Sequence, residues 1–426
     1  MIFKKFLNSP DKKRLFSNFV SLSILQGANY ILPLITFPYL VRVLGVEKFG
    51  LLAFATATIA YFQILTDYGF NLSATRDIAI HRENKEKVEE IFSSVMIIKF
   101  GLLILSFILL IILVFSFDKF RKDWEVFVLS FGMVVGQVLF PVWFFQGMEK
   151  MKYITILNIL SKLLFTVAIF VFVKSQADYW KVPLLNSLGF ILAGVLALWI
   201  VFREFGIRFR KVELNNIKIQ IIQNFPLFLS IASIPLFNET NLIILGIFTD
   251  NTTVGIYSVA SRIIGILITL QVPIVNAIFP WVSNELKKNS KNAIDKLMKI
   301  RNIGALLYFF ILTLIGVLSK WFIPFIFGNE FIKSIPSLLI MLYVPLLVYI
   351  ANIYGNQILI NLGKNNLFSI GLMFTGLLNL ILIIPLVVNF KENGAAISRL
   401  LSEVFLTLAM YYFANKELRK KEYDVL

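Results

Sequence analysis

Two long apolar runs within residues 17–77 set the strongest constraint on the fold of this chain. Each run is long enough to cross a bilayer, because about 20 apolar residues at a rise of 1.5 Å each span the roughly 30 Å of hydrocarbon. A short connection with Gly45 and Gly50 joins the two runs. The stretch therefore predicts a hairpin of two membrane-spanning helices.

Both helices of this hairpin carry polar residues at helical spacing. The residues that share a face are Gln26, Asn29, Tyr30 and Pro33 on the first helix and Gln63, Thr66 and Asp67 on the second. Polar side chains in lipid are costly, so each of these faces is expected to point into a helix bundle or a wet cavity.

Three motifs in the same stretch read LQGANYILPLITFPYLVRVLG (25–45), FGLLAFA (49–55) and TDYGFNLSATRD (66–77). They resemble the amino-terminal signature of bacterial polysaccharide flippases, the Wzx-type O-antigen transporters of the multidrug/oligosaccharidyl-lipid/polysaccharide (MOP) exporter superfamily. Chain length and the number of hairpins agree with this family over the rest of the sequence.

Composition independently indicates an integral membrane protein. Hydrophobic residues make up 58% of the 426 residues and aromatic residues 15%, which is incompatible with a water-soluble globule. The net charge of +16 lies in short loops between apolar runs, where basic residues fix orientation and contact anionic lipid. No basic module stands outside the apolar runs, so no nucleic-acid partner is expected. The absence of cysteine and the single histidine, His81, exclude thiolate and multi-histidine metal sites.

Twelve apolar runs are expected to cross the membrane as helices. They are 18–41, 50–71, 91–115, 125–147, 154–174, 181–202, 221–248, 254–283, 300–320, 336–361, 367–389 and 394–414. When residues at the ends of the runs are counted with the adjacent connections, 27 of the 41 Lys and Arg residues lie in the two tails and the even-numbered connections and 10 in the odd-numbered ones. This bias predicts that both termini are cytoplasmic in a bacterial inner-membrane protein. The connections are too short for a folded catalytic domain, so we expect a protein that is not an enzyme.

An internal repeat predicts two similar halves. The segment GVEKFGLLAFATA (45–57) aligns with DNTTVGIYSVASR (250–262), which pairs Gly50 with Gly255 and Ala55 with Ala260. The predicted fold is an all-α, MATE-like membrane protein with two six-helix lobes related by a pseudo-two-fold axis along the membrane normal. Its parts are an amino-terminal lobe 1–202, a cytoplasmic linker 203–220, a carboxyl-terminal lobe 221–414 and a cytoplasmic tail 415–426.

Prolines concentrate in three of the predicted spans. They are Pro33, Pro38, Pro226, Pro235, Pro273 and Pro280, in or at the ends of spans one, seven and eight. Because proline removes a helical hydrogen bond, these helices are expected to bend.

Seven charged residues fall inside predicted spans, where each costs at least about 2.5–3.5 kcal/mol and so requires a partner or water. They are Asp67, Lys99, Lys162, Glu239, Arg262, Arg399 and Glu403. Arg262 lies in the repeat counterpart of span two and suits phosphate, because a guanidinium binds phosphate through two hydrogen bonds. The alternative is a buried Arg262 that joins helices through a carboxylate such as Glu239.

Other cationic and amide side chains complete a predicted substrate cavity. Lys162 shares a polar stripe with Asn158, Ser161 and Thr166, which places it toward the interior. Lys99 either contacts substrate or extends to the cytoplasmic interface, and Arg42 either contacts substrate or anchors the outer end of span one. Gln26 and Asn29 belong to the same predicted cavity.

The carboxylates are candidates for gating or ion coupling. Asp67 is either protonatable or paired with Arg76 or Lys99. Arg399 and Glu403, at i and i+4, are expected to form a structural pair. Oxygen-bearing residues of three spans are similar in placement to the sodium site of lipid II flippases in the same superfamily, namely Asn238 and Glu239, Thr375 and Asn379, and Ser398 and Ser402.

The resemblance implies a function for this set of residues. It implies translocation of oligosaccharide units on undecaprenyl pyrophosphate from the inner to the outer leaflet by alternating access, for O-antigen or capsule synthesis. No cofactor is expected beyond proton or sodium coupling, and the implied partners are a polysaccharide polymerase and a chain-length regulator. The alternatives are a small-molecule exporter of the same fold, a membrane-embedded polymerase or ligase, and an inert scaffold.

Overall fold

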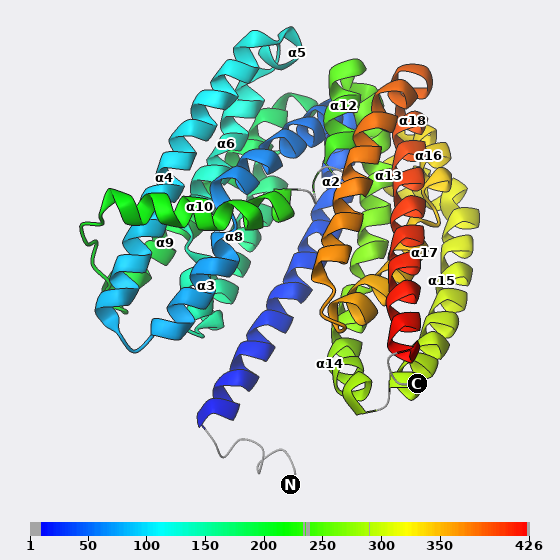
Figure 1. Ribbon diagram of the computed structural model, residues 1–426. Helices are drawn as coiled ribbons and strands as arrows, with labels where there is room; N and C mark the ends of the chain where they lie inside the picture. Colours follow the sequence, from blue (N-terminus) through cyan, green and yellow to red (C-terminus); the bar gives the residue numbers. More distant parts are fainter. Residues whose placement is uncertain (1–9, 233–234, 236–238, 289, 424–426) are drawn as a thin grey trace. The chain divides into compact units, whose positions relative to one another are not determined.

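The computed structural model describes residues 10–232, 235, 239–288 and 290–423, and these residues fold into helices without a β-strand (Figure 1). The chain divides into two compact units. Unit 1 comprises Met1–Leu44 and Ala55–Ala232, and unit 2 comprises Gly45–Phe54 and Ser233–Leu426. The all-α membrane fold predicted from the sequence is confirmed.

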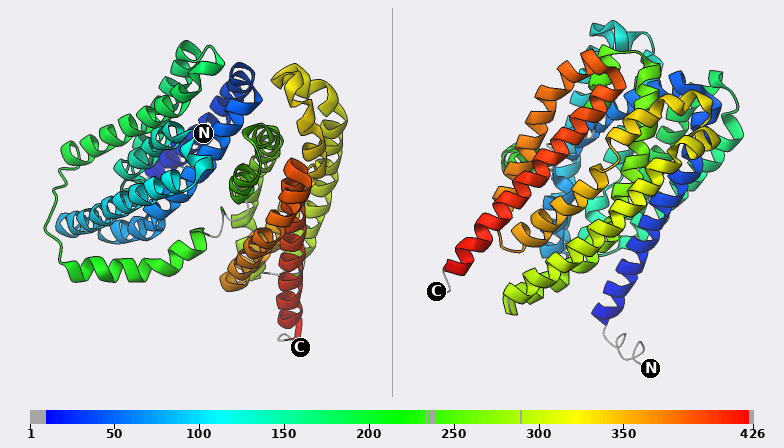
Figure 2. Two further views of the ribbon diagram at one scale, coloured as in Figure 1. Left: turned by 90° about the horizontal axis from the view of Figure 1, so that it is seen from above. Right: turned by 90° about the vertical axis from the view of Figure 1, so that its right-hand side faces the viewer.

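Unit 1 contains the first ten helical elements, except for the segment Gly45–Phe54 of α2. They are α2 (Pro10–Asp67), α3 (Phe70–His81), α4 (Lys85–Ser116), α5 (Asp118–Arg121), α6 (Trp124–Leu139), α7 (Val142–Gly147), α8 (Met151–Phe172), η1 (Gln176–Trp180), α9 (Lys181–Arg203) and α10 (Leu214–Ala232). Residues 204–213 lead to α10 along the outside of the unit, and α10 runs across its neighbouring helices (Figures 1 and 2).

Two glycines divide the first long helical segment. Gly45 interrupts α2 with φ 67° and ψ 176°, a conformation that is essentially restricted to glycine, so α2 consists of two helices. At the other end, Tyr68 and Gly69 have φ of 51° and 83°, which ends α2 at Asp67 and begins α3 at Phe70. The sequence therefore places a backbone break directly after a buried carboxylate.

Unit 2 contains the remaining helical elements. They are α12 (Thr240–Phe248), α13 (Asn251–Thr269), α14 (Val272–Lys288), α15 (Ser290–Phe327), η2 (Asn329–Ser334), α16 (Ile335–Ile340), α17 (Val344–Asn352), the π-helix η3 (Ile353–Ile360) and α18 (Asn365–Tyr423). Lys391, with φ 49° and ψ −127°, interrupts α18, which therefore consists of two helices.

The two glycines aligned by the repeat lie against each other within unit 2. A Cβ atom on Gly50 would lie 2.5 Å from the backbone N of Gly255 and would overlap the carbonyl oxygen of Asn251. A Cβ on Gly255 would overlap the carbonyl oxygen of Val46. This close approach of backbones explains why the short segment Gly45–Phe54 of α2 groups with unit 2.

Twelve separate spans are not confirmed. Among the described residues, nine helical segments are long and apolar enough to cross a membrane. Two of them, Ser23–His81 and Asn365–Lys420, each merge two predicted runs. The predicted run 221–248 is not among the nine, because it is divided into α10 and α12 and its middle lies partly outside the described residues.

Several predicted spans are single helices and others are broken. Runs 91–115, 181–202 and 300–320 lie within α4, α9 and α15, and run 154–174 ends two residues after α8. Run 254–283 divides at Leu270 and Gln271, just before Pro273, and so confirms the expected bend in span eight. Pro33 and Pro38 lie inside α2 and do not end it.

An aromatic core fills one part of unit 1. Phe92 of α4 packs against Trp143 and Phe144 of α7, with ring centroids 5.7 Å apart in both pairs. Phe144 in turn packs edge-on against Phe205, after α9, at 5.2 Å. This core holds α4, α7 and the start of the linker together.

Candidate functional site

Asp67 and Lys99 form a buried ion pair in unit 1. The ammonium of Lys99, from α4, lies 3.4 Å from the carboxylate of Asp67 at the end of α2. The Lys99 side chain is only 2% exposed, so it does not extend to the interface. Arg76, the other partner considered for Asp67, instead contacts Asp77 at 3.1 Å. Two residues predicted for different roles are therefore neighbours.

The polar face around this pair contacts α6. Gln137 of α6 donates a hydrogen bond of 3.2 Å to the carbonyl of Gln63, one turn before Asp67. Thr66 is buried and its hydroxyl donates to the carbonyl of Phe62 in its own helix. The polar stripe of the second predicted span is thus directed into unit 1, as the cost of polar groups in lipid requires.

Lys162 and Asn29 form a second polar contact in unit 1. The ammonium of Lys162, on α8, donates to Oδ1 of Asn29, on α2, at 2.6 Å. Both side chains are half-buried, so the pair stays accessible from one side. Gln26 lies about one turn from Asn29 and is exposed, and Arg42 is exposed near the end of the first part of α2.

Arg262 lies in the second half of α13 in unit 2. It lies about 17 Å along α13 from Asn251, at 1.5 Å per residue, and yet its side chain is exposed. The guanidinium carbon is 5.9 Å from the centroid of the Phe49 ring. Glu239, which precedes α12, interacts electrostatically with both Arg262 and Arg399. Arg262 therefore combines accessibility with a nearby carboxylate.

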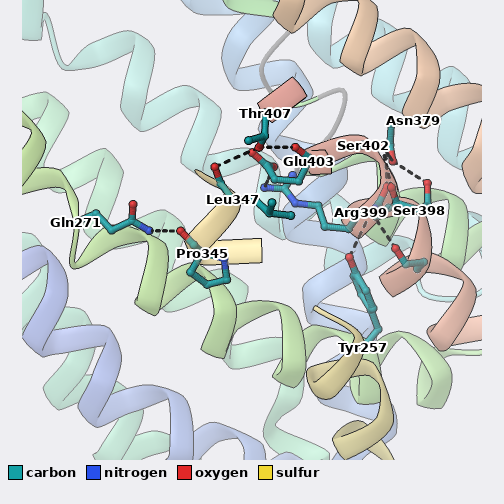
Figure 3. A network of polar contacts seen from close by, with 12 residues as sticks. Tyr257, Gln271, Pro345, Leu347, Asn379, Ser398, Arg399, Ser402, Glu403 and Thr407 are labelled. Carbon is teal, nitrogen blue, oxygen red and sulfur yellow. Dashed lines mark hydrogen bonds and ion pairs between the residues drawn. The ribbon is translucent and has the colours of Figure 1, made fainter. Parts of the chain in front are cut away.

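Arg399 and Glu403 form the ion pair expected from their spacing. Nη2 of Arg399 lies 3.6 Å from Oε2 of Glu403 on α18, and the side chains are 12% and 4% exposed (Figure 3). The hydroxyl of Thr407, one turn further, donates a hydrogen bond of 3.2 Å to the carbonyl of Leu347 and so connects α18 to α17. The pair is part of the interior of unit 2.

A hydrogen-bond network with Asn379 at its centre continues from this ion pair (Figure 3). The amide NH₂ of Asn379 donates a hydrogen bond of 2.8 Å to Oδ1 of Asn241, on α12. Oδ1 of Asn379 accepts a hydrogen bond of 2.8 Å from the Ser398 hydroxyl and lies 3.2 Å from the Ser402 hydroxyl. Asn241 donates in turn to the Tyr257 hydroxyl at 3.3 Å. Fully buried polar groups thus join α12, α13 and both parts of α18.

Asn241 and Tyr257 were not identified from the sequence. The available signal was Asn241 itself, which is followed by the apolar segment LIILGIF of α12. A lone amide in such a run requires a partner, because an unpaired polar group in an apolar interior is costly. Its partner lies 138 residues away in sequence, so the pairing itself was not predictable.

Four of the six residues proposed as sodium ligands hydrogen-bond to other groups of the protein. Asn379, Ser398 and Ser402 do so as described, and the Thr375 hydroxyl donates to the carbonyl of Gly371. Glu239 interacts electrostatically with Arg262 and Arg399. Asn238 lies outside the described residues. Within the described part of the chain, no group of three or more His, Cys, Asp and Glu residues is arranged to hold a metal. This arrangement is a closed hydrogen-bond network, and the sodium site stays a prediction from resemblance.

Apolar helices of membrane length that enclose buried ion pairs define a multi-pass membrane protein. Comparison with known proteins gives the family. Residues 15–286 match the family model described as "Polysaccharide biosynthesis protein". The chain is 35% identical over 410 residues to the "Putative O-antigen transporter" of Escherichia coli (strain K12), covering 96% of this chain and 98% of the relative.

Two further similarities extend this result. The chain is 25% identical over 374 residues to the "Probable low-salt glycan biosynthesis flippase Agl15" of Haloferax volcanii, covering 85% of this chain and 76% of the relative. Its fold is similar to that of the lipid II flippase MurJ in an inward closed conformation, with a TM-score of 0.70 at 14% identity, covering 94% of this chain and 87% of that chain.

The chain belongs to the polysaccharide biosynthesis protein family. The resemblance to Wzx-type flippases of the MOP exporter superfamily is thereby confirmed. The relatives are transporters and flippases, which confirms the prediction that this protein is not an enzyme.

Proposed function

We propose that this protein translocates undecaprenyl-pyrophosphate-linked oligosaccharide units from the inner to the outer leaflet of the bacterial cytoplasmic membrane by alternating access. The observation that carries the proposal is Arg262, an exposed guanidinium about 17 Å along a membrane helix. A charge at that depth requires water, a carboxylate partner or an anionic ligand, and the pyrophosphate diester of such a substrate is a dianion. The names of the relatives support the substrate class.

Arg262 and Lys162 take the binding roles in this proposal. The guanidinium of Arg262 suits bidentate contact with phosphate oxygens. Lys162 is held in place by one amide oxygen, that of Asn29, and that bond is weak enough to be exchanged for a charged oxygen of the substrate. Gln26, Arg42 and Asn29 would contact the sugar or phosphate groups beside them.

Coupling would depend on the buried carboxylates. Protonation of Asp67 removes the attraction to Lys99, so the pair would be stable in one conformation and weak in another. Glu239 stands near two arginines, and a phosphate that neutralises Arg262 would change the balance between them. We therefore propose a proton as the coupling ion, with Asp67 and Glu239 as gating residues and the network of Arg399, Glu403 and Asn379 as the rigid part of unit 2.

The membrane placement and partners follow from the same proposal. Both termini would be cytoplasmic, which puts the basic connections at the anionic inner surface. A polysaccharide polymerase and a chain-length regulator would receive the product in the outer leaflet.

A complementation experiment in the host tests the function. Loss of the protein should remove the surface polymer and leave its lipid-linked precursor in the inner leaflet, and the wild-type protein should reverse both effects. Arg262→Ala should insert normally and fail to complement, whereas Arg262→Lys should restore part of the activity because it keeps a positive charge. Arg203→Ala, at the exposed end of α9, is the matched control and should complement fully. Normal surface polymer with Arg262→Ala would remove Arg262 from the mechanism.

A further inference from the structure

The helix α10 and the segment before it form an unusual element of unit 1. Among the described residues, α10 is a 19-residue helix that is not among the nine segments able to cross a membrane. It lies across neighbouring helices of unit 1 instead of running along them, at the periphery of the unit (Figures 1 and 2). We name residues 204–232, which include α10, the strap.

The strap is tied to unit 1 at its beginning. The guanidinium of Arg210 lies 2.7 Å from Glu89 and 3.2 Å from Glu86, both on α4, and these two carboxylates raise the pKa of Arg210. The backbone N–H groups of Arg208 and Arg210 donate to Glu89 at 3.2 Å and to the Ser93 hydroxyl at 2.9 Å. The start of the strap therefore has a defined position.

The inner face of α10 packs against the apolar core of unit 1. Phe228 stacks on Tyr68 with ring centroids 4.8 Å apart, and Ile217 packs against the same apolar core of unit 1. A Cβ on Gly69 would lie 3.0 Å from Leu227, so the break after α2 accommodates this helix closely. One face of α10 is thus fixed to unit 1.

The face of α10 that adjoins this inner face is apolar and exposed. Leu214, Ile222 and Phe225 are 83%, 60% and 48% exposed, and Ile221 and Leu229 lie on the same face. At positions i, i+7, i+8, i+11 and i+15, these five side chains form one stripe along the helix. Such a stripe on a helix that lies across its neighbours is typical of an interfacial amphipathic helix (Figure 1).

Basic side chains accompany the uncovered stripe. Arg208, Lys211 and Lys218 are exposed and make no ion pair within the described residues. Lys218 lies within the stripe itself, where its aliphatic part can follow the apolar side chains while the ammonium reaches a headgroup. The acidic residues of the strap are Glu204, which accepts a hydrogen bond from Tyr153, and Glu213. Its surface is therefore apolar with a positive border.

We propose that the outer face of the strap binds anionic phospholipid, with acyl chains against the stripe and phosphate headgroups against Arg208, Lys211 and Lys218. Apolar area and attraction to anionic headgroups both contribute to the binding of such a helix. The contacts of Arg210 with Glu89 and of Phe228 with Tyr68 hold the strap against unit 1, so that its outer face stays exposed. An anionic lipid is then a structural partner of the segment that connects the two units, independent of the transported substrate.

Depth-dependent fluorescence quenching tests the proposal directly. The chain has no cysteine, so a bimane attached to Ile222→Cys, or to Leu214→Cys as a second position, reports only on the strap. The full-length labelled protein is reconstituted into vesicles that contain brominated phosphatidylglycerol or, at the same mole fraction, brominated phosphatidylcholine. We expect markedly stronger quenching by the brominated phosphatidylglycerol.

A charge-neutral variant and a matched control complete the experiment. Arg208→Gln/Lys211→Gln/Lys218→Gln keeps the Arg210 tie and should lower the preference for the anionic lipid by about fivefold for each charge removed. Arg121→Gln/Lys122→Gln/Lys320→Gln removes three exposed charges elsewhere and should keep the preference. Equal quenching by both lipids would overturn the proposal in favour of ordinary lipid contact. Absence of quenching by either lipid would overturn it by showing that protein covers the face.

Discussion

The ammonium group of Lys99 lies 3.4 Å from the carboxylate of Asp67, and both side chains are buried among the helices of unit 1. A buried ion pair contributes little net stability when intact, but removal of one partner leaves an uncompensated charge that typically costs about 3–5 kcal/mol. The pair therefore couples the end of α2 to α4, and this coupling can be measured.

The first prediction concerns this coupling. Lys99→Met should strongly lower the melting temperature of the purified protein in detergent, whereas Asp67→Leu/Lys99→Met should recover most of the loss because no buried charge remains. Lys174→Met, at an exposed position, is the control and should leave the melting temperature unchanged. A Lys99→Met protein as stable as the wild type would show that the carboxylate has another source of stabilisation. If Asp67 couples transport to protons, the stable double variant should still fail to transport.

The second prediction concerns the glycines at the internal repeat. Gly255→Ala should reduce the yield and stability of the folded protein severely, because the added Cβ would overlap the carbonyl oxygen of Val46 and both atoms belong to backbones that cannot move apart cheaply. Gly265→Ala provides a control in the same helix, since nothing lies within 4 Å of its Cβ. That change should be neutral or stabilising by up to about 1 kcal/mol, because alanine favours a helix.

Size-exclusion profiles and thermal melts of the two glycine variants give the measurement. Similar behaviour of Gly255→Ala and Gly265→Ala would contradict the close packing of Gly50 on Gly255. Gly50→Ala should resemble Gly255→Ala, because its Cβ would overlap the carbonyl oxygen of Asn251.

The third prediction concerns the buried amide network of unit 2. Asn379→Leu removes the hydrogen-bond partner of Asn241 Oδ1 and of the Ser398 hydroxyl, whereas the Ser402 hydroxyl keeps its bond to the carbonyl of Ser398. Each unsatisfied buried group typically costs about 1–3 kcal/mol. The free energy or temperature of unfolding should therefore fall clearly. Asn389→Leu, an exposed asparagine on the same helix, should have a small effect. Equal effects of the two changes would show that the network does not stabilise the unit.

The fourth prediction separates binding from folding at Lys162. Lys162→Met should preserve expression and melting temperature, because the half-buried ammonium has one hydrogen bond to Asn29 that a water can replace. It should nevertheless reduce complementation of surface polymer by about tenfold or more, if a charge-assisted contact of about 1.5–3 kcal/mol to phosphate is lost. Retained complementation with a reduced melting temperature would instead assign Lys162 to the scaffold.

Much of the fold was predictable from the sequence, because apolar runs of membrane length allow few structures. The helices α4, α8, α9 and α15 each contain all or nearly all of one predicted run for this reason. The break of the predicted run 221–248 was not predicted, because Pro226 and Pro235 indicate bending but do not determine where a helix ends.

The candidate site was predictable in its residue types and only partly in its pairings. Arg399 and Glu403 pair within one helix, where spacing alone determines the neighbour. Asp67 and Lys99 come from different helices, so the sequence allowed Arg76 as an equal alternative. The contact of Asn379 with Asn241 depends on how α12 packs on α18. The hydrophobic periodicity of each helix does not predict that packing.

The most direct test of the account is a flipping assay with purified protein in vesicles. Lipid-linked oligosaccharide is placed in the vesicles, and a membrane-impermeant glycosidase measures how fast the sugar in the inner leaflet becomes accessible. The account predicts that the inner-leaflet sugar becomes accessible rapidly with the wild-type protein and with Arg203→Ala. With Arg262→Ala, the rate should be close to that of vesicles without protein. A wild-type rate no faster than that of empty vesicles under a pH gradient of either direction, or full activity of Arg262→Ala, would contradict it.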